Sequence, residues 1–123
     1  MDLVIGINND TTFTPEVTGV TLRNAQWVPT QAISVGQSLA NHTRLAGMLE
    51  GTVPFDGSVR LRYYWSGRES ADVTLTFEGR DFDGTPAVGY GLDIVPPTAL
   101  TGSDVAVTKD DNGALFLLLT VQQ

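Results

Sequence analysis

Hydrophobic and polar residues alternate along much of the chain, and the alternation is clearest in residues 58–65. One side of an extended chain would carry Val59, Leu61, Tyr63 and Trp65, and the other would carry Arg60, Arg62 and Tyr64. A period of two residues is typical of a strand that buries one face. Residues 72–78 repeat this period, so the sequence predicts a hairpin whose loop is residues 66–70.

Further strands are predicted between the glycines and prolines that punctuate the sequence. They cover residues 3–8, 17–23, 87–95, 104–108 and 114–121, with shorter candidates at 27–28 and 32–35. Residues 43–52 are ambiguous and could include a helical turn. Gly89 and Gly91, on either side of Tyr90, suggest a bend or bulge. Asn112 and Gly113 predict the turn of a last hairpin. We therefore expect one all-β domain, residues 1–123, built as an antiparallel β-sandwich of two packed sheets.

The last predicted strand carries apolar side chains on both faces. One face has Leu115, Leu117, Leu119 and Val121, and the other has Phe116 and Leu118. A central strand that is covered on both sides explains this pattern. A contact with a second subunit or with a membrane explains it as well.

Composition narrows the classes of function. The chain has 123 residues and no cysteine, which excludes disulfides, thiolate metal sites and a cysteine nucleophile. Its net charge is -7, so it lacks the basic surface that nucleic acids and anionic membranes require. The longest apolar run, residues 114–119, is too short to span a membrane, and the first residues lack the pattern of a signal peptide. We expect a cytoplasmic protein or leaderless secretion.

Candidate catalytic and metal-binding residues are few. His42 is the one histidine, and its polar neighbours favour a surface position over a catalytic base. Residues 81–84 and 110–113 place carboxylates next to glycine, which is typical of turns and does not complete a calcium-binding loop. The sequence therefore predicts no catalytic residue, no metal and no cofactor.

The candidate ligand-binding residues are aromatic and cationic. They are Trp27, Arg62, Tyr63, Tyr64, Trp65 and Arg68. Tyrosine and tryptophan suit a surface that is partly apolar and partly wet, and arginine can bind phosphate or stack on a ring. The alternative is that Tyr63 and Trp65 belong to the core and that the arginines pair with Glu69 and Glu78.

Four segments resemble the actinoporin-like superfamily, which includes the aegerolysins. Residues 3–10 (LVIGINND) are similar to its opening strand and turn, and residues 20–27 (VTLRNAQW) to the second aegerolysin strand with its tryptophan. Residues 50–52 followed by 59–65 (VRLRYYW) resemble the approach to an aromatic strand, and residues 112–121 resemble the closing hairpin. The resemblance implies a β-sandwich that recognises sphingolipid-containing membranes. The chain departs from actinoporins because it starts with a strand and lacks their dense phosphocholine-binding cluster, which argues against independent pore formation.

Three functions are compatible with the sequence. The first is a non-enzymatic binding module for a neutral or zwitterionic membrane lipid headgroup or a carbohydrate. The second is a structural or assembly subunit that contacts a partner protein or forms a homo-oligomer. The third is a small β-barrel enzyme that acts by shape on an apolar substrate, with Asp81 or Glu50 as a candidate carboxylate.

Overall fold

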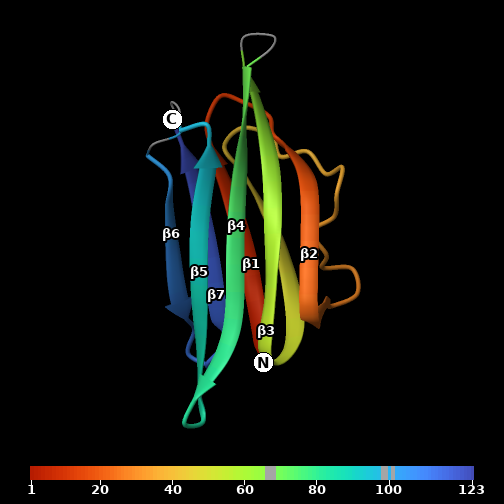
Figure 1. Ribbon diagram of the computed structural model, residues 1–123, viewed down its shortest axis with the longest axis vertical. Helices are drawn as coiled ribbons and strands as arrows, with labels where there is room; N and C mark the ends of the chain where they lie inside the picture. The colour runs from red at the N-terminus through yellow and green to blue at the C-terminus, as the bar shows by residue number, and fades with distance from the viewer. Residues whose placement is uncertain (66–68, 98–99, 101) are drawn as a thin grey trace.

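The computed structural model describes the backbone of residues 1–65, 69–97, 100 and 102–123, and their side chains except at positions 65 and 69. These residues form strands and no helix (Figure 1). The strands are β1 (Asp2–Asp10), β2 (Glu16–Trp27), β3 (Thr43–Trp65), β4 (Glu69–Phe82), β5 (Thr85–Val95), β6 (Asp104–Lys109) and β7 (Leu115–Gln122). The prediction of an all-β chain is confirmed.

The strands belong to one hydrogen-bonded sheet that curls into a nearly barrel-shaped arrangement (Figure 1). The strand order is β5-β4-β3-β1-β7-β6, and β2 also pairs with β3. The expected two separate sheets are not clearly present, because the 23-residue strand β3 passes from one half of the sheet to the other. Its residues 43–50 pair with β1, and its residues 55–65 pair with β4. The pairing of β1 with β7 is parallel, which corrects the expectation of purely antiparallel strands.

The core lies inside the curled sheet and consists of alternate apolar residues of each strand. Leu3, Ile5 and Ile7 of β1 are buried, as are the members of the predicted alternation, Val59, Leu61, Tyr63, Val73, Leu75 and Phe77. Burial of each such side chain contributes roughly 1.5–3 kcal/mol before the loss of chain entropy. The strand pairing of both predicted hairpins is confirmed, since β3 pairs with β4 and β6 pairs with β7. Of the expected loop 66–70, Glu69 and Ser70 already belong to β4, and residues 66–68 lie outside the described residues.

Three local predictions are corrected. Residues 43–52 are strand, with no helical turn, because their partners on β1 and β2 extend them. Residues 32–35 form no strand. The glycines beside Tyr90 mark no bulge, since β5 pairs with β4 without a register shift.

The two carboxylate-glycine segments form the predicted turns. Asp83 and Gly84 have φ angles of 53° and 86°, a left-handed conformation that closes a tight hairpin between β4 and β5. The Asp110 carboxylate accepts hydrogen bonds from the backbone of Asn112 and Ala114, at 2.9 and 2.8 Å. The Asp110 carboxylate therefore organises the backbone of its turn.

The position of β7 clarifies its two apolar faces. It lies between β1 and β6, with Leu115, Leu117 and Leu119 buried inside. Phe116 and Leu118 point to the outer face and stay partly exposed. The strand is thus central in the sheet but fully covered on one side only. No helix that could span a membrane occurs in the part of the chain that the structure describes.

Candidate functional site

The outer face of β2, β3, β4 and β5 carries rows of polar side chains, because the register aligns polar positions of neighbouring strands. One row runs across the sheet through Thr21, Ser58, Thr76 and Gly91. The next row runs through Arg23, Asp56, Glu78 and Gly89. Residues that lie up to seventy positions apart in the sequence thereby form one surface.

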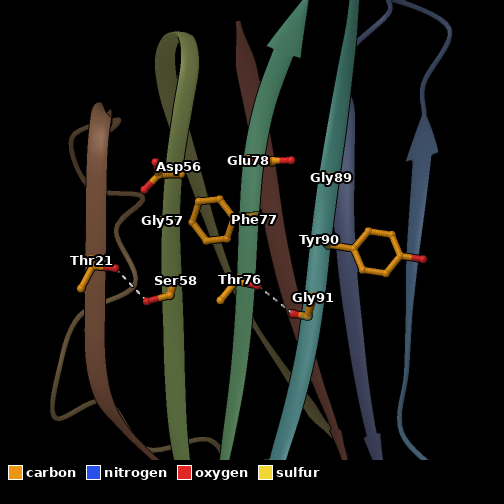
Figure 2. Close-up of a pocket in the computed structure, with 10 residues that line it drawn as sticks. All are labelled: Thr21, Asp56, Gly57, Ser58, Thr76, Phe77, Glu78, Gly89, Tyr90 and Gly91. Atoms are coloured by element: carbon orange, nitrogen blue, oxygen red, sulfur yellow. Dashed lines mark hydrogen bonds between the residues drawn. The ribbon is translucent and has the colours of Figure 1, made fainter.

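A trough of about 510 Å³ lies over these two rows (Figure 2). Its lining residues are Thr21, Asp56, Gly57, Ser58, Thr76, Phe77, Glu78, Gly89, Tyr90 and Gly91. Gly89 and Gly91 let two of these side chains lie against the backbone of β5, since a Cβ atom there would lie 2.9 Å from Glu78 Oε1 and 2.8 Å from Thr76 Oγ1. The ring of Tyr90 is directed away from the trough (Figure 2), and the rest of the lining consists of hydroxyls, carboxylates, glycine backbone and Phe77.

The hydroxyl groups of the trough form short local hydrogen bonds. Thr21 Oγ1 and Ser58 Oγ lie 2.7 Å apart. Thr76 Oγ1 donates to the carbonyl oxygen of Gly91 at 3.3 Å. Each hydroxyl has a donor and two acceptor positions, so capacity for a ligand remains at all three.

The two carboxylates of the trough are each held by an arginine. Asp56 lies 3.7 Å from Arg23, and Glu78 accepts a 2.9 Å hydrogen bond from Arg80. The bond from Arg80 lowers the pKa of Glu78 below its ordinary value of 4.5. Glu78 is therefore ionised at neutral pH and is an acceptor only.

The same outer face continues along β3 toward the hairpin of β3 and β4. Arg62 makes a forked contact with Asp72, with Nε 2.9 Å and Nη2 3.4 Å from the two carboxylate oxygens. The hydrogen bond lowers the pKa of Asp72 and raises that of Arg62. Arg60 donates to Thr18 Oγ1 at 3.2 Å. Tyr64 is about half exposed beyond them.

The structure separates the ligand-binding residues that the sequence suggested. Arg62 and Tyr64 share the outer face of β3. Tyr63 has no exposed surface, and its hydroxyl donates to Asn9 Oδ1 at 3.2 Å inside the molecule. Burial raises the pKa of Tyr63 above its ordinary value of 10.0. Tyr63 therefore belongs to the core, as the alternative interpretation had it.

The remaining predicted residues lie elsewhere. Trp27 ends β2 and packs partly buried against the core beside Gly47 and Ile33. The side chain of Trp65 and the whole of Arg68 lie outside the described residues. The suggested pairing of arginines with Glu69 cannot be placed for the same reason, while Glu78 pairs with Arg80 and Arg62 pairs with Asp72.

Two further hollows have less to offer a ligand. One of about 650 Å³ lies near residues 24–26 and 50–53, and Glu50 is its one charged residue. The other, of about 300 Å³, contains His42, whose Nδ1 lies 3.1 Å from the Asp10 carboxylate on an exposed surface. Within residues 1–64, 70–97, 100 and 102–123, no three histidine, aspartate or glutamate side chains are grouped to hold a metal ion.

Sequence reasoning missed the trough, although it identified Glu78 as a possible arginine partner. The two-residue period alone places Asp56, Ser58, Thr76 and Glu78 on outward positions. Which strands are neighbours, and in which register, was the missing information. No model of a known protein family matches the chain, and no curated protein matches it.

Proposed function

We propose that the chain is a non-enzymatic binding module that holds a neutral carbohydrate in the trough of the outer face. The composition of the trough carries the proposal, since its lining presents three hydroxyls and two carboxylates beside the backbone of Gly89 and Gly91. Sugar hydroxyl groups donate to carboxylates and exchange hydrogen bonds with threonine and serine. An open trough also admits a saccharide chain that continues beyond it on both sides.

The charges of the outer face favour a neutral ligand over a phosphate. Arg23, Arg62 and Arg80 each already contact a carboxylate. Arg60 contributes a hydrogen bond to Thr18 and is in no ion pair that involves the described side chains. On the described part of this outer face, a phosphate would thus find one arginine without an ion pair, on a protein whose net charge is -7.

The state of Glu78 supports binding without hydrolysis. Glu78 and Asp56 are direct cross-strand partners, and two neighbouring carboxylates are also what glycoside hydrolases use. One of the pair must then act as an acid, which requires a raised pKa. The hydrogen bond from Arg80 shifts the pKa of Glu78 in the opposite direction. Glu78 is therefore suited to accept hydrogen bonds from a bound sugar.

A zwitterionic sphingolipid headgroup is the second candidate. The observation that favours it is that Arg62 and Tyr64 lie on one outer face close to the end of β3. It also agrees with the resemblance of residues 59–65 to an aegerolysin aromatic strand. The forked contact of Arg62 with Asp72 counts against it, because that carboxylate occupies the donors that a phosphate needs.

Calorimetric titration with soluble neutral gluco-, manno-, xylo- and chito-oligosaccharides tests the proposal. At least one series is expected to bind with a dissociation constant between about 1 μM and 1 mM. Asp56→Ala removes an acceptor, and the side chain of Gly91→Val displaces the Thr76 hydroxyl, so each should weaken binding roughly tenfold or more. Asp104→Ala, which removes an exposed carboxylate of β6, is the matched control and should bind as the unmodified chain does.

The same preparation is sedimented with vesicles of sphingomyelin and phosphatidylcholine. If the protein sediments with these vesicles and the calorimetric titrations show no heat of binding for any saccharide, the lipid proposal replaces the carbohydrate proposal. If the Asp56→Ala and Gly91→Val variants bind saccharides as the unmodified chain does, the trough is not the binding site.

A further inference from the structure

A second outer face, formed by residues 43–50 of β3 with β1, β7 and β6, is largely apolar at its centre. Its apolar patch consists of Val4, Ala46, Met48, Ala106, Phe116 and Leu118, all at least partly exposed. The register arranges the patch in two rows. Met48, Val4 and Phe116 form a row of large side chains, and Ala46, Gly6, Leu118 and Ala106 form a row of mostly small ones.

On β3, opposite charges border the two rows at their two ends. Arg44 lies in the next row on one side, with Asn8 and Asp104, and Glu50 lies in the next row on the other side, with Asp2. None of Arg44, Glu50 and Asp2 takes part in an ion pair among the side chains that the structure places. Arg44 and Glu50 are six residues apart on one strand, or about 20 Å, so they cannot neutralise each other within the chain.

We infer that a second copy of this chain covers the apolar patch, related to the first by a two-fold axis that runs across the strands between the two rows. This operation places Arg44 of each copy opposite Glu50 of the other. It also places the row of large side chains over the row of small ones, with Val4 above Gly6 and Met48 above Ala46. Leu118 and Arg44 of the same copy lean over Gly6, where a Cβ would lie 3.0 Å from Leu118 Cδ1 and 3.7 Å from Arg44 Cδ, so Val4 of the other copy packs on these side chains.

The surface fits its own copy better than it fits other partners. Arg44 and Glu50 of each copy meet their opposite charge at the position related by the axis, which is the property of an isologous interface, while Asp2 meets the neutral Asn8. Two sheets pack face to face when their strands are aligned within about 30°. An anionic bilayer surface offers a partner for Arg44 but none for Glu50.

The size of the patch sets the expected strength of the dimer. Four strands about 4.8 Å apart and four rows along them cover about 400 Å² of sheet on each copy. This is roughly half of the ~800 Å² per partner in a standard stable interface. The dimer is therefore reversible, with a dissociation constant in the micromolar range, about 1 to 100 μM.

Sedimentation velocity of the full chain over a concentration series tests this inference through charge reversal. Arg44→Glu faces Glu50 of the other copy with a like charge, and Glu50→Arg faces Arg44 in the same way. Each should raise the dissociation constant roughly tenfold or more. The double variant restores opposite charges across the axis and should return the constant to within a few-fold of its starting value.

Arg60→Glu is the matched control, because it makes the same change of charge on the opposite outer face. It should leave the dimer unchanged. A chain that stays monomeric up to about 1 mM overturns the inference. The inference is also wrong if the two single variants dimerise as the unmodified chain does, or if the double variant does not restore the dimer. If the chain sediments with phosphatidylcholine vesicles and Phe116→Ser abolishes this sedimentation, the apolar patch binds a membrane and the dimer inference is overturned too. The carbohydrate proposal stands or falls separately, since Arg44→Glu leaves the trough unaltered.

Discussion

The hydroxyl of Tyr63 donates a hydrogen bond to Oδ1 of Asn9 at 3.2 Å, across the interior of the curled sheet. Both residues are buried, with 0% and 1% of their surface exposed. Thr11 donates to the same oxygen at 2.7 Å. The side-chain nitrogen of Asn9 donates to the backbone carbonyls of Phe13, Leu39 and Ala40. Asn9 therefore joins the β3 half of the sheet to β1 and to the loop between β2 and β3.

Removal of this junction should destabilise the protein in two distinguishable steps. Tyr63→Phe removes one neutral hydrogen bond and should lower the free energy of unfolding by about 1 kcal/mol. Asn9→Ala leaves several buried groups without a partner and should lower it by about 3 kcal/mol or more. Urea unfolding monitored by circular dichroism measures both. Asn41→Ala, at an exposed asparagine, is the control, and an Asn9→Ala effect no larger than this control would contradict the junction.

Stability should fall at alkaline pH because of Tyr63. Its pKa is raised in the folded state by burial, so the folded protein keeps its proton where the unfolded chain releases it. The free energy of unfolding is thus unaffected below pH 10 and decreases above it, by at most about 1.4 kcal/mol per pH unit. Urea unfolding between pH 8 and about pH 11.5 measures the slope. Tyr63→Phe should lack this component, and equal slopes in both chains would refute the assignment.

The packing of Phe55 against Gly79 predicts a site that tolerates no side chain. A Cβ atom on Gly79 would overlap the ring of Phe55, which is itself buried. Gly79→Ala should therefore lower the free energy of unfolding by about 2 kcal/mol. Gly19→Ala is the control, because its Cβ would meet Arg60 at an ordinary 3.6 Å. Thermal unfolding of the two variants compares them, and similar melting temperatures would show that the ring moves freely.

The hairpins of the fold were predictable because their signals are local. The alternation in residues 58–65 and 72–78 and the Asn112-Gly113 turn each lie within about 20 residues, and the structure pairs the strands as predicted. The continuity of β3 through Gly51 and Pro54 was not predictable, since glycine and proline both interrupt the pattern of a strand. The parallel pairing of β1 with β7 joins the two ends of the sequence, and no local pattern encodes such a contact.

The candidate site was predictable only as far as the two-residue period reaches. That period already separates Tyr63 from Arg62 and Tyr64, so the buried position of Tyr63 follows from the sequence pattern. The trough requires four strands in register, with Thr21 and Gly91 brought to the same row. Gly89 and Gly91 are indistinguishable in sequence from the glycines of a bulge, and in the structure they let the Glu78 carboxylate and the Thr76 hydroxyl lie against the backbone of β5.

The most direct test of the proposed function is a two-dimensional ¹H–¹⁵N nuclear magnetic resonance titration with the saccharide that binds most tightly. A ligand in the trough should shift the amide signals of Ser58, Thr76, Gly89 and Gly91 and leave those of the apolar patch in place. Shifts confined to the patch or to residues near Tyr64, or no shift with any neutral saccharide, would contradict the account.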